Sequence, residues 1–106
     1  ARSAAIQAAT LFATQVPLHT MQASFKVFEL CKAMAEEGNP NSVSDAGVGV
    51  LAARAAVLGA GLNVKINASG LKDREAADKL VGEANKLIKK ANELETEIMK
   101  IVEDKL

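Results

Sequence analysis

The sequence predicts an all-α protein, a multihelical bundle of about four helices that ends in a long C-terminal helix. Hydrophobic residues make up 49% of the chain but aromatic residues only 3%, so Ala, Leu, Val and Ile must form the core. Such a core favours close helix–helix packing over a β-sandwich. No turn is flanked by the alternating apolar and polar residues that a β-hairpin requires. We expect residues 1–106 to form a single helical unit.

The first two helices are predicted from apolar residues at helical spacing, over about residues 3–13 and 17–37. Pro17 suits the first position of the second helix, because the N–H that proline lacks has no partner there in any case. Gly38 can end that helix, because glycine adopts a positive φ without steric cost. The Asn-Pro pair that follows predicts a turn.

A third helix is predicted over about residues 44–67. Ser42 or Ser44 can cap its start by accepting hydrogen bonds from backbone N–H groups. Asp45 would then lie in the first turn, where unpaired N–H groups favour an anion. The residues that follow are almost all small and apolar, so we expect the Asp45 carboxylate to lie at the edge of a tightly packed region of low dielectric.

Between Ala46 and Leu62 only Arg54 is charged. As a helix this segment spans about 26 Å, which is short for a membrane crossing, and a charge near its centre disfavours one further. We therefore expect a buried core helix and no membrane. One narrow stripe of this helix is small along its length and polar at both ends. Its members are Asp45, Gly49, Ala52, Ala56, Gly59, Asn63 and Asn67.

The two polar ends of this stripe are too far apart to serve one small molecule within one chain. Asp45 and Asn63 are separated by about 27 Å along a helix. An antiparallel two-fold pairing of this helix would set Asp45 of one subunit against Asn63 of the other. The sequence therefore suggests a homodimer.

The fourth helix is predicted to begin after Asp73, a plausible N-cap, and to reach the C-terminus. Its apolar residues recur in steps of three and four, with charged residues around them, which is the pattern of a heptad seam. We interpret it as one amphipathic arm of a helical bundle, with a coiled-coil dimer arm as the alternative. The seam consists of Ala77, Leu80, Ala84, Leu87, Ala91, Leu94, Ile98 and Ile101.

Composition excludes several classes of function. Thirteen basic and thirteen acidic residues give no net charge, which argues against a nucleic-acid binder. The single cysteine, Cys31, excludes an internal disulfide, and with no signal-peptide pattern at the start it suggests a cytoplasmic protein. One histidine and one cysteine cannot form a dedicated zinc site, so we expect no metal.

Two segments together carry a resemblance to a known family: 39–49, with sequence NPNSVSDAGVG, and 62–67, with sequence LNVKIN. The chain resembles the formiminotransferase-cyclodeaminase C-terminal family, which includes methenyltetrahydrofolate cyclohydrolases and formimidoyltetrahydrofolate cyclodeaminases. The resemblance implies an all-helical fold, commonly dimeric, that acts on the one-carbon unit bridging N5 and N10 of tetrahydrofolate. It also implies that residues 1–106 are the C-terminal half of a larger domain, whose N-terminal half is needed to complete the site.

The resemblance implies one of two related reactions. A cyclohydrolase, a hydrolase, adds water to the methenyl carbon, whereas a cyclodeaminase, an ammonia lyase, closes N10 onto a formimino carbon and expels ammonia. Both pass through a tetrahedral carbon and need proton transfers, for which Asp45 is the candidate catalytic residue. The alternative for Asp45 is a bond to backbone N–H groups at a helix start. No bound cofactor is expected, because a tetrahydrofolate derivative is the substrate.

Five polar residues are candidates for binding the substrate. Asn41, Ser42 and Ser44 could hydrogen-bond a pterin or align water, although turns and caps use the same residue types. Asn63 and Asn67, four apart on one face, could bind the pterin, or they could form hydrogen bonds between helices.

Arg54 and Lys65 could engage the carboxylates of the folate glutamate tail, with ion pairing or burial of their aliphatic stems as the alternative. His19, the only histidine, is expected in the first turn of the second helix. It could act as a general base, but we expect it to be solvated or to lie at the edge of the core. Cys31 is expected to be a small core residue. A function of another class also fits the sequence: a non-catalytic helical interaction or dimerisation module, with the glycine stripe and the heptad seam as interfaces.

Overall fold

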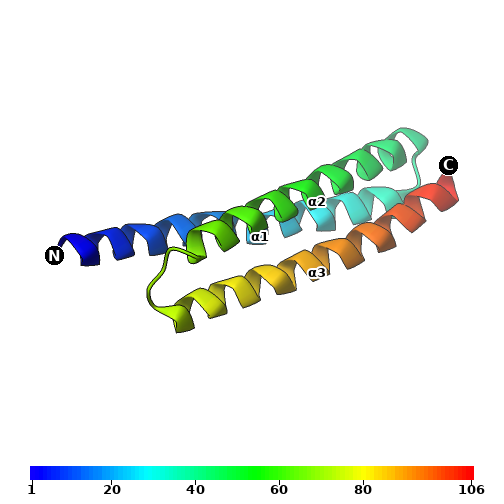
Figure 1. Ribbon diagram of the computed structural model, residues 1–106. Helices are drawn as coiled ribbons and strands as arrows, with labels where there is room; N and C mark the ends of the chain where they lie inside the picture. The colour runs from blue at the N-terminus through cyan, green and yellow to red at the C-terminus, as the bar shows by residue number, and fades with distance from the viewer.

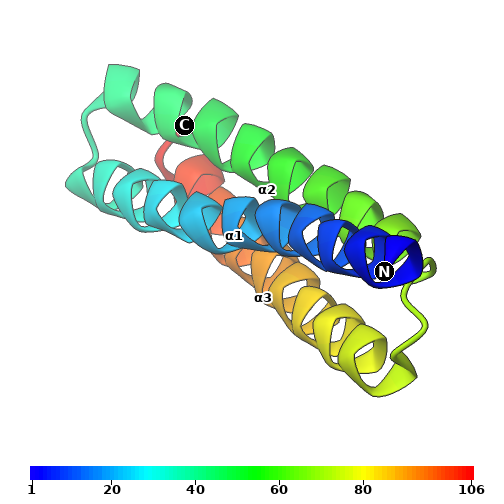
Figure 2. The same ribbon diagram turned by 90° about the vertical axis from the view of Figure 1, so that its left-hand side faces the viewer.

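The computed structural model describes all 106 residues as three long helices: α1 (Arg2–Glu37), α2 (Pro40–Ala68) and α3 (Arg74–Lys105). The helices run antiparallel to their sequence neighbours and form a rod of 58 × 17 × 15 Å, with the start of α1 extending beyond the rest (Figure 1). Figure 2 shows α1 in front, with α2 above it and α3 below it, and α2 and α3 also pack directly against each other behind α1. The all-helical fold is confirmed, but the chain has three helices rather than about four.

The first two predicted helices are one, because Pro17 lies inside α1 rather than at a helix start. A proline in a helix interior removes the hydrogen bond to the carbonyl four residues earlier, at a cost of about 3 kcal/mol. Here that carbonyl belongs to Ala13, and it accepts a hydrogen bond from the Asn67 Nδ2 of α2 at 3.0 Å. A contact between helices thus supplies the partner that the proline cannot, and α1 continues.

The predicted break between α1 and α2 is confirmed, but α2 begins earlier than predicted. Gly38 has a φ of 81°, the left-handed conformation that favours glycine. The N-cap is Asn39, whose Oδ1 accepts from the Asn41 backbone N–H at 3.1 Å, and Pro40 occupies the first helical position. The prediction that Ser42 or Ser44 caps this helix is therefore wrong.

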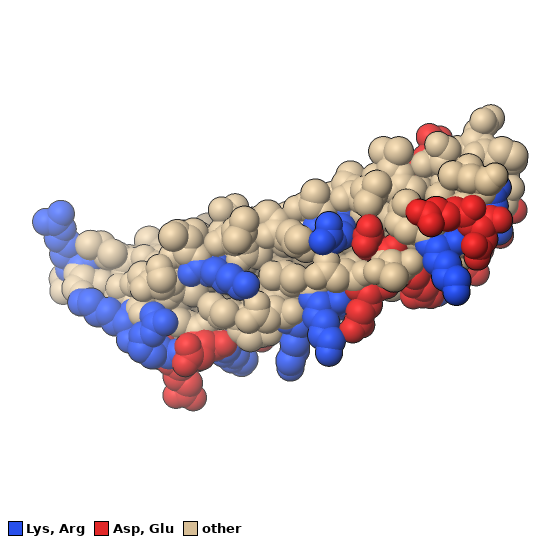
Figure 3. Space-filling model, turned by 45° about the vertical axis from the view of Figure 1, so that its right-hand side comes forward, with Lys and Arg blue, Asp and Glu red and all other residues tan.

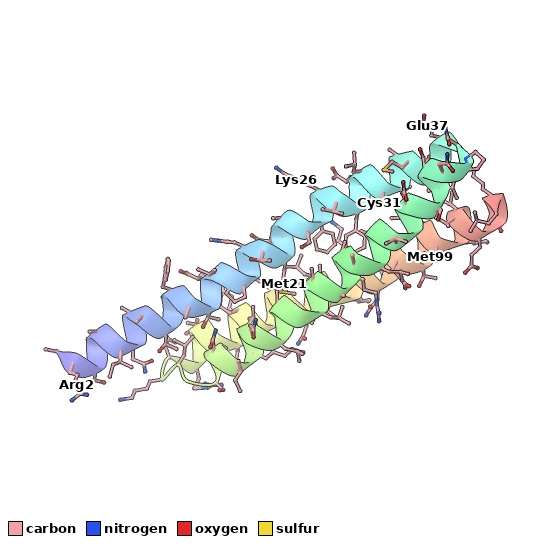
Figure 4. All side chains as sticks on the ribbon, turned by 90° about the horizontal axis from the view of Figure 1, so that it is seen from above. Arg2, Met21, Lys26, Cys31, Glu37 and Met99 are labelled. Carbon is pink, nitrogen blue, oxygen red and sulfur yellow. The ribbon has the colours of Figure 1, made fainter.

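The core lies along the line where the three helices meet. Phe28, Met21 and Ile98 are its largest fully buried side chains. Figure 4 shows Met21 and Cys31 on α1, with Glu37 marking its end beside the turn into α2. Small residues of α2 let the neighbouring helices approach: a Cβ on Gly49 would lie 2.7 Å from the Cys31 Sγ.

The fourth predicted helix is confirmed as α3, an arm of the bundle. Asp73 is its N-cap, with a side chain that accepts from the Ala76 backbone N–H at 3.1 Å. Half of the predicted seam is buried and the other half is partly buried. The end of α3 also completes the end of α1, because the Lys105 Nζ donates to the carbonyls of Ala35 and Glu36 at 2.8 and 2.7 Å.

The third predicted helix, α2, is buried on one face only. Its residues Val43, Val50, Val57 and Val64 are fully buried, whereas Leu62 on the other side is 69% exposed. The charged side chains gather along α3 and at the ends of the rod, while the edge formed by α2 is almost free of charge (Figure 3). By length and composition alone α2 is apolar enough to span a membrane, but a third of its most apolar window is buried in the bundle.

Candidate functional site

The candidate residues near the start of α2 lie on an open helix surface. Asp45 is the sixth residue of α2, so the prediction that it lies in the first turn is wrong. Asn41, Ser44 and Asp45 are exposed, Ser42 is half-buried, and none of them lines a pocket of the chain. In one chain by itself, the Asp45 carboxylate therefore faces solvent, and a second surface is needed to enclose it.

The small-residue stripe is also exposed, so the prediction of a wholly buried core helix is wrong for this face. At about 100° per residue the stripe lies roughly opposite the side of α2 that packs on α3. Asp45, Ala52, Ala56, Gly59 and Asn63 are exposed, while the two remaining members, which lie nearest to α1, are half-buried. Four large apolar residues extend this surface on its outer side, between 46% and 69% exposed: Val48, Leu51, Leu62 and Ile66.

Asn63 and Asn67 lie together in a groove between α1 and α2 that has a volume of about 650 Å³. The Asn67 amide is engaged in the hydrogen bond to Ala13 described above, so interhelical bonding, the alternative considered for it, is what the structure shows. Asn63 is exposed at the groove and has no hydrogen-bond partner in the chain. The remaining lining residues are Phe12, Ala13, Val16, Pro17, Thr20, Ala56 and Ala60.

Arg54 is on the opposite side of α2 from Asn63. Its Nε donates to the Asn92 Oδ1 of α3 at 2.8 Å, beside a shallow groove of about 580 Å³ lined by polar residues of α3. Lys65 is exposed. The predicted binding residues thus fall into three places: the start of α2, the α1–α2 groove, and the α2–α3 face with Arg54.

His19 and Cys31 lie outside the three places that hold the predicted binding residues. His19 is exposed in the middle of α1 rather than in a first turn, at the edge of a cavity between α1 and α3. Cys31 is buried, as predicted, and burial raises the pKa of its thiol. No group of three His, Cys, Asp or Glu side chains lies close enough to hold a metal ion.

The sequence reasoning missed Phe12 and Val16, which form the α1 side of the groove. The sequence prediction places Phe12 near the end of the first predicted helix, over about residues 3–13, and Val16 in the link between that helix and the one predicted to begin at Pro17. The sequence feature that could have indicated a continuous first helix was Asn67. Its amide can replace the hydrogen bond that a proline inside a helix cannot make.

Comparison with known proteins identifies relatives of the whole chain. The family described as Formiminotransferase-cyclodeaminase matches residues 1–86. A methenyltetrahydrofolate cyclohydrolase of Methylorubrum extorquens is 42% identical over 106 residues, which are the full chain and 51% of that protein. A formimidoyltransferase-cyclodeaminase of Dictyostelium discoideum is 33% identical over 104 residues, 98% of this chain and 19% of that protein. The chain thus spans about half the length of the first relative and less of the second.

Proposed function

The chain belongs to the formiminotransferase-cyclodeaminase family, and from this membership we propose that the protein acts on the N5–N10 one-carbon bridge of a tetrahydrofolate derivative, as a methenyltetrahydrofolate cyclohydrolase. The observation that carries the proposal is the 42% identity to a relative of that name across all 106 residues. Cyclodeaminase activity is the second candidate, favoured by the relative from Dictyostelium.

The cyclohydrolase reaction defines what the protein must supply. Water adds to the methenyl carbon and releases one of its protons, which gives a neutral tetrahedral carbon that bears a hydroxyl group. The bond from this carbon to N5 then breaks as the hydroxyl becomes the formyl carbonyl, and the hydroxyl proton passes to N5. The products are 10-formyltetrahydrofolate and a proton, and no redox step is involved. A carboxylate near the carbon can accept the proton from water and offset the positive charge of the bridge. We assign this role to Asp45.

An exposed Asp45 needs a covering surface, and we propose that a second copy of the chain provides it. The stripe between Asp45 and Asn63 presents only small side chains, which allow two helix backbones to approach closely, and large apolar residues flank it. In an antiparallel pairing centred near residue 54, Asp45 faces Asn63 of the partner subunit. Each α1–α2 groove then receives a carboxylate from the other chain.

The part of the protein that corresponds to the rest of the Methylorubrum relative is proposed to complete the enclosure. The described groove is open and the described carboxylate is exposed, so this chain and its copy supply only some of the walls. In this account the Arg54 guanidinium, held at its Nε by Asn92, is available to bind a carboxylate of the substrate tail.

The experiment is an activity assay of the full-length protein with 5,10-methenyltetrahydrofolate, in which turnover is measured as the decrease in absorbance of this substrate. Asp45→Asn is expected to reduce kcat by roughly 10²-fold or more, the usual contribution of a positioned proton-transfer group. Asp78→Asn, at another exposed aspartate, is the matched control and should leave kcat unchanged. Ammonia release from 5-formiminotetrahydrofolate distinguishes the cyclodeaminase. Normal turnover by Asp45→Asn would refute the assignment of Asp45.

A non-catalytic interaction module is the alternative from another class, and the exposed apolar side of α2 is the observation that favours it. Such a module would form dimers or bind another helical protein without any folate turnover. Full-length protein that dimerises but leaves both folate substrates unchanged would support this alternative over the enzyme.

A further inference from the structure

We infer that the groove between α1 and α2 at Pro17 binds the flat, neutral pyrimidinone half of the folate's pterin ring, with the Asn63 amide on the polar edge of that ring and Phe12 against its face. This inference rests on the proposed function, because it locates one part of the proposed substrate. It adds the place where the ring of the substrate binds and the separation of that place from the glutamate tail, neither of which the family relationship supplies.

The size and walls of the groove suit such a ring. Its volume of about 650 Å³ falls within the range of roughly 300–1,000 Å³ typical of small-molecule sites. Ala56 and Ala60 leave room on the α2 side, while Phe12, which is 68% exposed, lines the α1 side. An exposed aromatic ring beside a slot of small residues is suited to stacking a heterocycle.

The polar groups of the groove leave one side chain free to recognise a ligand. Three lining residues have polar side chains: Thr20, Asn63 and Asn67. The Thr20 Oγ1 donates to the Val16 carbonyl at 3.3 Å, and the Asn67 Nδ2 donates to the Ala13 carbonyl at 3.0 Å. Asn63 has a free amide, which carries both a donor and an acceptor. The edge of a pterin ring presents the complementary pair, an amide-like N–H beside a carbonyl.

Charge separates the ring from the rest of the folate. None of the nine lining residues is charged, so a carboxylate of the glutamate tail would lose hydration there without gaining a cationic partner. The neutral pyrimidinone half of the pterin carries no such penalty. The two cations of α2, Arg54 and Lys65, are each two residues from a lining residue and therefore lie about 160° away from it around the helix. Arg54 contacts α3 instead. The groove therefore selects the ring of the substrate and leaves its anionic tail outside.

The test measures binding to the full-length protein of three probes: 5-formyltetrahydrofolate, which is not turned over, and the fragments 6-hydroxymethylpterin and p-aminobenzoylglutamate. Asn63→Ala and Phe12→Ala are each expected to weaken binding of the first two probes by about tenfold, as loss of a hydrogen bond or a stacking contact does. Binding of p-aminobenzoylglutamate should not change. Gln15→Ala, an exposed residue of α1 outside this groove, is the matched control.

The outcomes separate the groove from the proposed function. Variants that bind every probe as the unaltered protein does, with turnover of the methenyl substrate retained, would overturn the groove assignment and leave the enzyme proposal intact. A selective loss of p-aminobenzoylglutamate binding would also overturn it. An unaltered protein that neither binds nor turns over any folate would refute both. Helix content and oligomeric state of each variant, measured in parallel, distinguish loss of the contact from loss of the fold.

Discussion

At the scale of single residues, the hydrogen bond from Asn67 to the Ala13 carbonyl has the widest consequences. It supplies the partner that Pro17 cannot, keeps α1 continuous, and fixes the floor of the α1–α2 groove. The bond lies at the surface of the bundle, so its contribution to stability is expected to be ordinary, at about 1 kcal/mol. Because the bond takes the place of one that Pro17 cannot make, its contribution to the free energy of unfolding can be measured by substituting both residues.

We predict that Asn67→Ala lowers the free energy of unfolding by about 1 kcal/mol, because the Ala13 carbonyl loses the hydrogen bond from the Asn67 amide. In a Pro17→Ala background the same change should cost less, because the new N–H at position 17 can pair with Ala13. Urea unfolding of the four proteins checks this. Equal losses in both backgrounds would show that the bond does not compensate for the proline.

The Cys31 thiol predicts a dependence of stability on pH. Burial raises its pKa above the ordinary value of 9.0, so the folded protein holds the proton more tightly than the unfolded chain. The tighter binding of this proton stabilises the folded state. The stabilisation is fully present below about pH 9 and is lost as the pH rises through the pKa of the folded protein. Unfolding measured from pH 7 to pH 10 should show stability falling more steeply for the unaltered protein than for Cys31→Ala. Identical slopes would contradict this account.

At the scale of helices, the glycines of α2 and α3 differ in what surrounds them. A Cβ on Gly61 would lie 2.9 Å from the Ile88 Cδ1 and 3.3 Å from the Met21 Cε, whereas nothing lies within 4 Å of one on Gly82. Gly82→Ala should stabilise the protein by up to about 1 kcal/mol through helix propensity. We predict that Gly61→Ala gains less than this, by about 1 kcal/mol, because the ends of the Ile88 and Met21 side chains must shift to make room. Thermal unfolding of both variants checks the pair, and an equal gain from the two substitutions would refute close packing at Gly61.

Local sequence signals predicted some helix boundaries and missed others, for physical reasons. Gly38 and the N-cap Asp73 act within a few residues of themselves, and both predictions are confirmed. The start at Pro17 was wrong because its compensating donor lies on another helix. Asn39 rather than Ser42 or Ser44 caps α2, since Pro40 can occupy the first helical position directly after it.

The candidate site was less predictable than the fold. The spacing of Asp45, Asn63 and Asn67 on one face was correct, but helical periodicity does not reveal which face is buried. The hydrophobicity of α2 is nearly uniform around its axis, so its outer side could not be distinguished from the core by composition. The groove itself depends on two helices, and only the structure places Phe12 beside Asn63.

At the scale of the whole molecule, the exposed apolar side of α2 predicts a second copy of the chain. Gly59, an exposed member of the stripe between Ala56 and Asn63, has open space around its Cβ direction. Gly59→Glu should convert the full-length protein to a monomer, because it places a charge in the proposed contact. Gly82→Glu, on the exposed side of α3, should leave the mass unchanged. Light scattering after gel filtration checks both, and a dimeric Gly59→Glu protein would contradict pairing through this stripe.

The most direct test of the account is to mix two impaired variants of the full-length protein, Asp45→Asn and Asn63→Ala, by joint unfolding and refolding. The assay is run at a substrate concentration far below KM, where the tenfold weaker binding expected of Asn63→Ala lowers turnover about tenfold. If Asp45 completes a site with Asn63 of the partner subunit, each mixed dimer carries one unaltered site. An equal mixture should then recover about a quarter of the turnover that the unaltered protein shows with 5,10-methenyltetrahydrofolate. A mixture that stays as inactive as its components, although mixed dimers form, would contradict a site shared between subunits.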